Sequence, residues 1–136
     1  MPLFSPPQLI QTAFSEISAN TTTTSGSFVD LLTVTLTTGP TRVEIYFTTS
    51  ASNNAFGGAS LQFQITIDGV AQRGCKLRGI ALSTASCAAI FFRSAQLSIG
   101  SHTIKVQWLT DVGTAQIRPV TTIQEHGSLL VNEITV

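Results

Sequence analysis

The feature that most constrains this chain is a period-two alternation of apolar and polar residues along most of its length. In the segment 102–110, for example, Ile104, Val106 and Trp108 are separated by single polar residues. Successive side chains of a β-strand point to opposite faces, so this pattern predicts strands that are buried on one side. No segment shows the 3.6-residue period of an amphipathic helix. The chain is therefore expected to be all-β.

The alternation and the turn residues between segments predict about nine short strands with turns every 8–12 residues. The strands are expected near 13–18 and at 28–37, 42–49, 61–68, 70–78, 87–97, 102–110, 114–120 and 128–136. Asp68-Gly69 is the strongest turn signal and predicts a tight hairpin. The polar segment 20–27 is either a loop or a ragged edge strand, and the register around 79–88 stays open. This spacing is typical of an antiparallel jelly-roll β-sandwich.

The first 13 residues are expected to form an extended N-terminal arm, followed by one jelly-roll domain over 14–136. Three prolines among the first seven residues disfavour regular strand pairing. The arm also carries four apolar side chains, which are Leu3, Phe4, Leu9 and Ile10. We therefore expect the arm either to pack on its own domain or to dock on a partner.

The composition favours self-association. Only 10% of the residues are charged, and seven basic and seven acidic side chains cancel. A neutral chain has no general electrostatic footprint for nucleic acid, so no nucleic-acid partner is expected. The polar strand positions are filled by Thr, Ser and Gln, with 20 threonines and 14 serines in the chain. We expect the side of the strands that carries Tyr46, the threonines of 28–37 and the glutamines of 61–68 to be a smooth, uncharged face that packs against a symmetry mate.

No targeting or metal signal is evident. The N-terminus lacks the basic and apolar regions of a signal peptide, and no apolar run approaches the roughly 18 residues of a membrane span. We therefore expect synthesis in the cytoplasm and no membrane partner. Cys75 and Cys87 have no accompanying zinc-ligand spacing. Two buried thiols are the favoured interpretation, and whether they pair stays open. No cofactor and no metal site is expected.

No catalytic site is expected either. His102 and His126 are interpreted as exposed or turn-capping side chains, and a shared metal or pH-sensing ring on an oligomer axis is the alternative. The carboxylates are scattered one per strand or turn, and the G-x-S-x-G and phosphate-binding motifs are absent.

Two segments are candidates for recognition. The loop 50–60 contains Asn53, Asn54 and Phe56, and Phe56 is either an exposed anchor or a plug for the end of the barrel. The return strand carries three basic residues, with Lys76 and Arg78 on one face and Arg73 on the other. These three are interpreted either as partners of Glu44 or Glu133 across strands or as a patch for an acidic partner.

Three segments carry a resemblance to a known class of proteins. They read FQITIDGV at 63–70, GSHTIKVQW at 100–108 and SLLVNEI at 128–134. Together with the strand order, they resemble the small jelly-roll domains of tailed-phage virion proteins, which are similar in architecture to the trimeric C1q and tumour-necrosis-factor heads. The resemblance covers about residues 14–136, and its motifs mark a fold and not a chemistry.

The resemblance implies a non-enzymatic bacteriophage virion protein that forms a homotrimer. The arm lies outside the resemblance. In the sharper form of the hypothesis, the chain is a head-decoration or fibre protein that this arm anchors to other capsid or tail proteins, through Leu3, Phe4, Leu9 and Ile10. The alternative is a tail receptor-binding tip, or a carbohydrate-binding module, that recognises host glycans through Asn53, Asn54 and Phe56. A small hydrolase is a further rival from another class.

Overall fold

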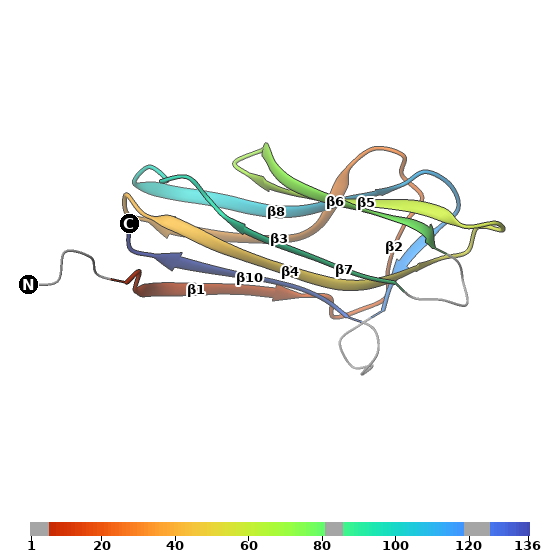
Figure 1. Ribbon diagram of the computed structural model, residues 1–136, viewed down its shortest axis with the longest axis horizontal. Helices are drawn as coiled ribbons and strands as arrows, with labels where there is room; N and C mark the ends of the chain where they lie inside the picture. Colours follow the sequence, from red (N-terminus) through yellow and green to blue (C-terminus); the bar gives the residue numbers. More distant parts are fainter. Residues whose placement is uncertain (1–5, 81–85, 119–125) are drawn as a thin grey trace, which may run out of the picture.

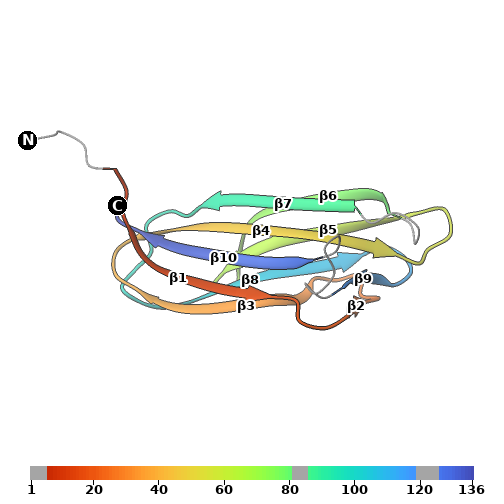
Figure 2. The same ribbon diagram turned by 90° about the horizontal axis from the view of Figure 1, so that it is seen from below.

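The computed structural model describes residues 6–80, 86–118 and 126–136, and in these ranges the chain forms two antiparallel sheets packed face to face (Figures 1 and 2). The larger sheet has the order β1-β10-β4-β9-β2, with β7 paired to β4, and the smaller has the order β3-β8-β5-β6. The strands are β1 (Leu9–Glu16), β2 (Thr21–Thr23), β3 (Val29–Thr38), β4 (Arg42–Asn53), β5 (Ala59–Ile67), β6 (Val70–Ile80), β7 (Ser86–Arg93), β8 (Gly100–Thr110), β9 (Ala115–Ile117) and β10 (Gly127–Ile134).

The core lies between the two sheets and is built from the apolar half of each alternating strand. Phe47 of the larger sheet lies 5.4 Å from Phe63 of the smaller one, measured between ring centroids. The Phe63 ring in turn stacks near Trp108 at 6.2 Å. All three side chains are buried, and each contributes on the order of 2 kcal/mol through removal of apolar surface from water. The predicted all-β jelly-roll sandwich is confirmed.

Two local predictions are confirmed by the backbone. Asp68 and Gly69 both have positive φ angles, 50° and 81°, as a tight hairpin between β5 and β6 requires. The segment 20–27 contains the short edge strand β2, in which Thr22 pairs with Gln116 of β9. The described residues include no helix long and apolar enough to cross a membrane.

The first strand begins earlier than the sequence suggested. β1 starts at Leu9 and pairs with β10 from Leu9 opposite Ile134 to Glu16 opposite Ser128. Residues 9–13, assigned above to the arm, are therefore part of the larger sheet. The last proline of the N-terminal segment is Pro7, so every residue of β1 has a backbone N–H that can pair with β10. Leu3 and Phe4 lie outside the described residues.

Several other boundaries differ, each for a reason of strand pairing. β4 continues to Asn53 because its last two residues pair with β9, so the predicted loop 50–60 shrinks to 54–58. β7 ends at Arg93, before the predicted end at 97. It pairs with β4 of the larger sheet and not with β6, so β6 is an edge strand of the smaller sheet.

The two cysteines are free thiols. Cys75 is half-buried in β6, and burial raises the pKa of its thiol. Cys87 is exposed, so the expectation of two buried thiols is wrong for this residue. The alternation of β7 places Ala88 and Ile90 in the core and turns Cys87 outward.

Candidate functional site: interaction surfaces

An apolar row crosses the outer face of the larger sheet. Four residues on neighbouring strands lie in register, namely Phe14 of β1, Leu130 of β10, Tyr46 of β4 and Phe91 of β7. Phe14 is 56% exposed and Phe91 is 52% exposed. The rings of Tyr46 and Phe91 lie 4.9 Å apart. Contiguous exposed apolar surface of this kind marks an interaction site in soluble proteins. We call these four residues the outer row.

The polar groups beside the outer row are paired within the chain. Glu44 accepts hydrogen bonds from the Tyr46 hydroxyl and from Arg93 Nη2, each at 2.7 Å. The Tyr46 hydrogen bond, followed by that of Arg93, holds the pKa of Glu44 below its usual value. On the other side, the hydroxyls of Thr48 and Ser128 lie 3.2 Å apart. A partner can therefore cover the row without leaving these groups unpaired.

The expected uncharged face is not formed, and that expectation is wrong. Tyr46 lies on β4 of the larger sheet, whereas the threonines of β3 and the glutamines of β5 lie on the smaller sheet, and the two sheets form separate layers (Figure 1). The face with the threonines and glutamines also carries an ion pair, Lys105 Nζ to Asp30 Oδ2 at 2.7 Å. Consecutive strands β3 and β4 enter different sheets, which the alternation cannot reveal.

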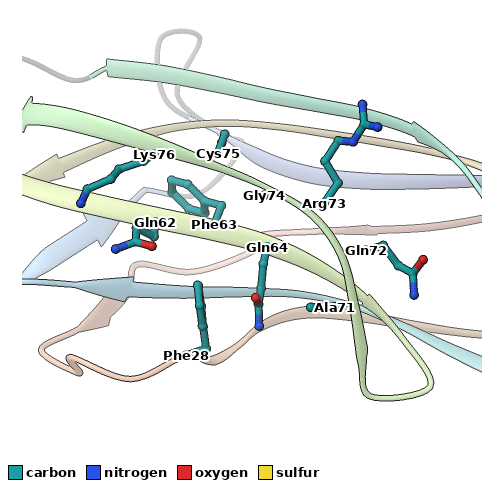
Figure 3. Close-up of a pocket in the computed structure, with 10 residues that line it drawn as sticks. All are labelled: Phe28, Gln62, Phe63, Gln64, Ala71, Gln72, Arg73, Gly74, Cys75 and Lys76. Atoms are coloured by element: carbon teal, nitrogen blue, oxygen red, sulfur yellow. The ribbon is translucent and has the colours of Figure 1, made fainter.

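The outer face of the smaller sheet contains a hollow of about 490 Å³ over β5 and β6 (Figure 3). Its lining includes Phe28, Gln62, Gln64, Gly74 and Lys76. Gly74 lines the hollow and lies close to β5; a Cβ at this position would lie 2.8 Å from the carbonyl oxygen of Phe63. The close approach of β5 and β6 therefore requires glycine at this position.

The basic residues of β6 do not pair as proposed. Register places Lys76 opposite Gln62 on the outer face and Arg73 opposite the buried Ile65, which confirms that Lys76 and Arg73 face opposite ways. Arg73 instead lies over the ring of Phe92, 5.5 Å from its centroid.

Neither proposed carboxylate is available to these basic residues. Glu44 binds Arg93, as described above, and Glu133 accepts hydrogen bonds from Gln11, Thr41 and the Gly39 amide. The expected pairing with Glu44 or Glu133 is therefore wrong.

The three residues of the predicted recognition loop have different roles. Asn53 is buried, and its Nδ2 donates to Thr110 Oγ1 and to the Val112 carbonyl, both at 2.9 Å. Asn54 is exposed and its Oδ1 accepts the Thr114 amide at 2.7 Å. Phe56 is 109% exposed, which agrees with the exposed alternative and excludes the plug for the barrel end. Both asparagines are therefore held by hydrogen bonds within the chain, whereas the Phe56 side chain is exposed to solvent.

His102 is a turn-capping residue that is buried instead of exposed. Its Nδ1 lies 2.6 Å from Asp68 Oδ2 and its Nε2 lies 2.7 Å from the Ser98 carbonyl oxygen. The Ser98 carbonyl and then Asp68 raise the pKa of His102, and His102 and then the Thr103 amide lower the pKa of Asp68. Both ring nitrogens are occupied, which leaves neither in position to take a proton from a nucleophile. His126 is half-buried before β10.

The described residues contain no cluster of three or more potential metal ligands. The outer row and the hollow were not predicted from the sequence. A signal for the row was present in Ile90-Phe91-Phe92, because an alternating strand with three bulky apolar residues in succession must turn one of them outward.

No family model matches the sequence, and a search of curated proteins finds no match. Among solved structures, the fold is similar to a chain of the infectious bursal disease virus structure, Gx strain, with a TM-score of 0.55 and 13% sequence identity. The similarity covers 91% of this chain and 32% of that chain, so this chain spans about a third of its neighbour's length. At this identity the likeness shows a shared fold.

Proposed function

We propose that this chain is a non-enzymatic structural protein of a virus particle that assembles as a homo-oligomer. The observation that carries the proposal is the outer row, which exposes two phenylalanines and a tyrosine across four neighbouring strands. The shared fold with a chain of infectious bursal disease virus supports the virion role. The resemblance to tailed-phage domains narrows it to a homotrimeric head-decoration or fibre protein located in the virion.

A second copy of the chain is the partner that best fits the outer row. The whole chain has no net charge and few charged residues, so copies do not repel one another strongly. The polar groups beside the row are already satisfied, which keeps the cost of desolvation low. The segment 1–7 then serves in this proposal as the anchoring arm that contacts other capsid or tail proteins.

The test is the solution mass of the chain, measured by light scattering for the wild type and for Phe14→Ser/Phe91→Ser. The wild type should have the mass of a trimer, and the double variant should be a monomer with an unchanged circular dichroism spectrum. Phe56→Ser is the matched control, because it removes an exposed phenylalanine away from the sheet and should leave the trimer intact. A monomeric wild type would contradict the proposal.

A receptor-binding role is the second candidate function, favoured by the hollow on the smaller sheet. Because the hollow and the outer row lie on opposite sheets, covering the row with another copy leaves the hollow open to solvent. One chain can therefore serve both roles.

A further inference from the structure

We propose that the hollow on the smaller sheet is a binding site for an acidic oligosaccharide, distinct from the end loop that the sequence suggested. This inference goes beyond the proposed structural role and does not depend on it. It rests on the geometry of the hollow and on the side chains that are left without partners there.

A row of polar side chains across four strands borders the hollow, and its last position, Gly74, has no side chain. Asp30, Gln107, Gln64 and Gly74 lie in register across β3, β8, β5 and β6. Gln107 Nε2 donates to Asp30 Oδ1 and Gln64 Nε2 donates to Gln107 Oε1, both at 2.9 Å. This chain of amides fixes the Gln64 side chain with its Oε1 as an open acceptor. Gly74 lines the hollow opposite Gln64 and adds no side chain to it.

The next positions supply polar groups with no partner of their own. Gln62 and Lys76 lie opposite each other on β5 and β6, and both line the hollow (Figure 3). Neither side chain makes a hydrogen bond or ion pair to any other residue that the structure describes. Among the residues that the structure describes, no carboxylate lines the hollow. The nearest acidic group in the row, Asp30, is held by Lys105 and Gln107.

Phe28 adds an apolar wall. Phe28 is half-buried and comes immediately before β3. Its side chain lies beside that of Gln64 (Figure 3). A pyranose ring has an apolar C–H face and a rim of hydroxyls, so it fits an aromatic ring flanked by side-chain amides. The volume of about 490 Å³ lies within the usual range for small-molecule sites.

The arrangement also indicates the charge and length of the sugar. The unpaired Lys76 ammonium favours a carboxylate or sulfate group over a neutral sugar. Phe28 precedes β3 and Lys76 lies on β6, and three inter-strand spacings, roughly 14 Å between backbones, separate these strands. Because residues from both ends of this span line the hollow, we infer that the ligand is an oligosaccharide with a ring on Phe28 and an acidic group at Lys76.

The experiment is a glycan array of neutral, carboxylated and sulfated oligosaccharides probed with the full chain. The best acidic ligand and its neutral counterpart are then titrated by calorimetry. Wild-type protein should bind the acidic ligand more tightly. Lys76→Gln should weaken acidic binding about tenfold and leave neutral binding unchanged, because a charge-assisted hydrogen bond is worth about that factor.

Further variants separate the hollow from the end loop. Phe28→Ala and Gln62→Ala should each weaken binding of both ligands, and Gln62→Ala keeps the test valid if Phe28→Ala disturbs folding. Phe56→Ala and Asn54→Ala are the matched controls and should bind as the wild type does. Loss of binding only in the end-loop variants, or no binding to any saccharide at millimolar concentration, overturns the proposal. The solution mass is measured in parallel, so a failed sugar site is distinguished from failed assembly.

Discussion

His102 and Glu133 are buried polar side chains that tie turns to strands. His102 joins the Asp68 hairpin to Ser98, and Glu133 of β10 accepts hydrogen bonds from the β3–β4 turn. His102 was predicted at a turn but not as a buried residue, because Asp68, which binds its Nδ1, lies 34 residues away in the sequence. Only the Ser98 carbonyl at its Nε2 is local, four residues away. Burial of Glu133 was likewise not predicted, because its partners are 92 to 122 residues away.

The His102–Asp68 pair should make stability depend on pH. The pKa of His102 is raised above 6.5 in the folded state, so its contribution is complete below that pH and is lost as pH rises through the folded pKa. The pKa of Asp68 is lowered, so its contribution is present above about 3.8 and is lost as pH falls. Melting temperature should therefore fall between pH 6 and pH 8.5.

His102→Gln should be less stable at pH 6 and should lose this decline, whereas the control His126→Gln should keep it. Melting curves at pH 6 and pH 8.5 measure both effects. An unchanged decline in His102→Gln would assign the pH dependence to other groups.

Glu133 should be costly to replace with an apolar residue. Burial raises its pKa, but hydrogen bonds from Thr41, Gln11 and the Gly39 amide together leave the pKa below its usual value. Glu133→Leu leaves these donors without an acceptor and should lower the free energy of unfolding by roughly 3 kcal/mol. The same substitution at exposed Glu16 should change it by less than about 1 kcal/mol. Urea denaturation at equal protein concentration compares the two.

The strands themselves were largely predictable, and their partners were not. The alternation gave the buried faces of β4, β5, β8 and β10 because burial on one side imposes a period of two. The start of β1 was missed because residues 9–13 show weak alternation and gain their structure by pairing with β10, far away in the sequence. The extension of β4 to Asn53 likewise depends on the distant strand β9.

Truncation tests where the arm ends. Removing residues 1–7 keeps β1 and all its pairing with β10, so melting temperature and solution mass should be unchanged. If the arm is the anchor, this variant should no longer attach to the particle. Removing residues 1–16 deletes β1 and exposes the edge of β10, which should lower the melting temperature by roughly 10 °C or more. Attachment of the shorter truncation at the wild-type level would contradict the anchoring role.

At the scale of the whole molecule, the two outer faces differ in kind. The larger sheet exposes the outer row, and the smaller sheet exposes polar side chains around the hollow. An apolar row on one outer face is suited to burial in an assembly, and polar side chains around the hollow on the other are suited to contact with solvent.

Assembly through the outer row should make stability depend on protein concentration. Association with folded copies stabilises the folded state by mass action, so the wild-type melting temperature should rise over a hundredfold increase in concentration. Phe14→Ser/Phe91→Ser should remove this dependence, and Phe56→Ser should retain it. Scanning calorimetry over that concentration range provides the measurement. A wild-type melting temperature that stays constant would argue against association.

The sequence by itself determined the all-β class, most strand positions, the Asp68-Gly69 hairpin and the inward residues of most strands, because each of these follows from local periodicity or local turn chemistry. The tertiary structure decided which sheet each strand joins, and so which outward residues share a surface. Tyr46 was grouped with the threonines of β3 by sequence, yet it lies in register with Phe14, Leu130 and Phe91 on the other sheet. Strand pairing joins residues that are far apart in the chain, and the period-two pattern of a strand does not identify the strand with which it pairs.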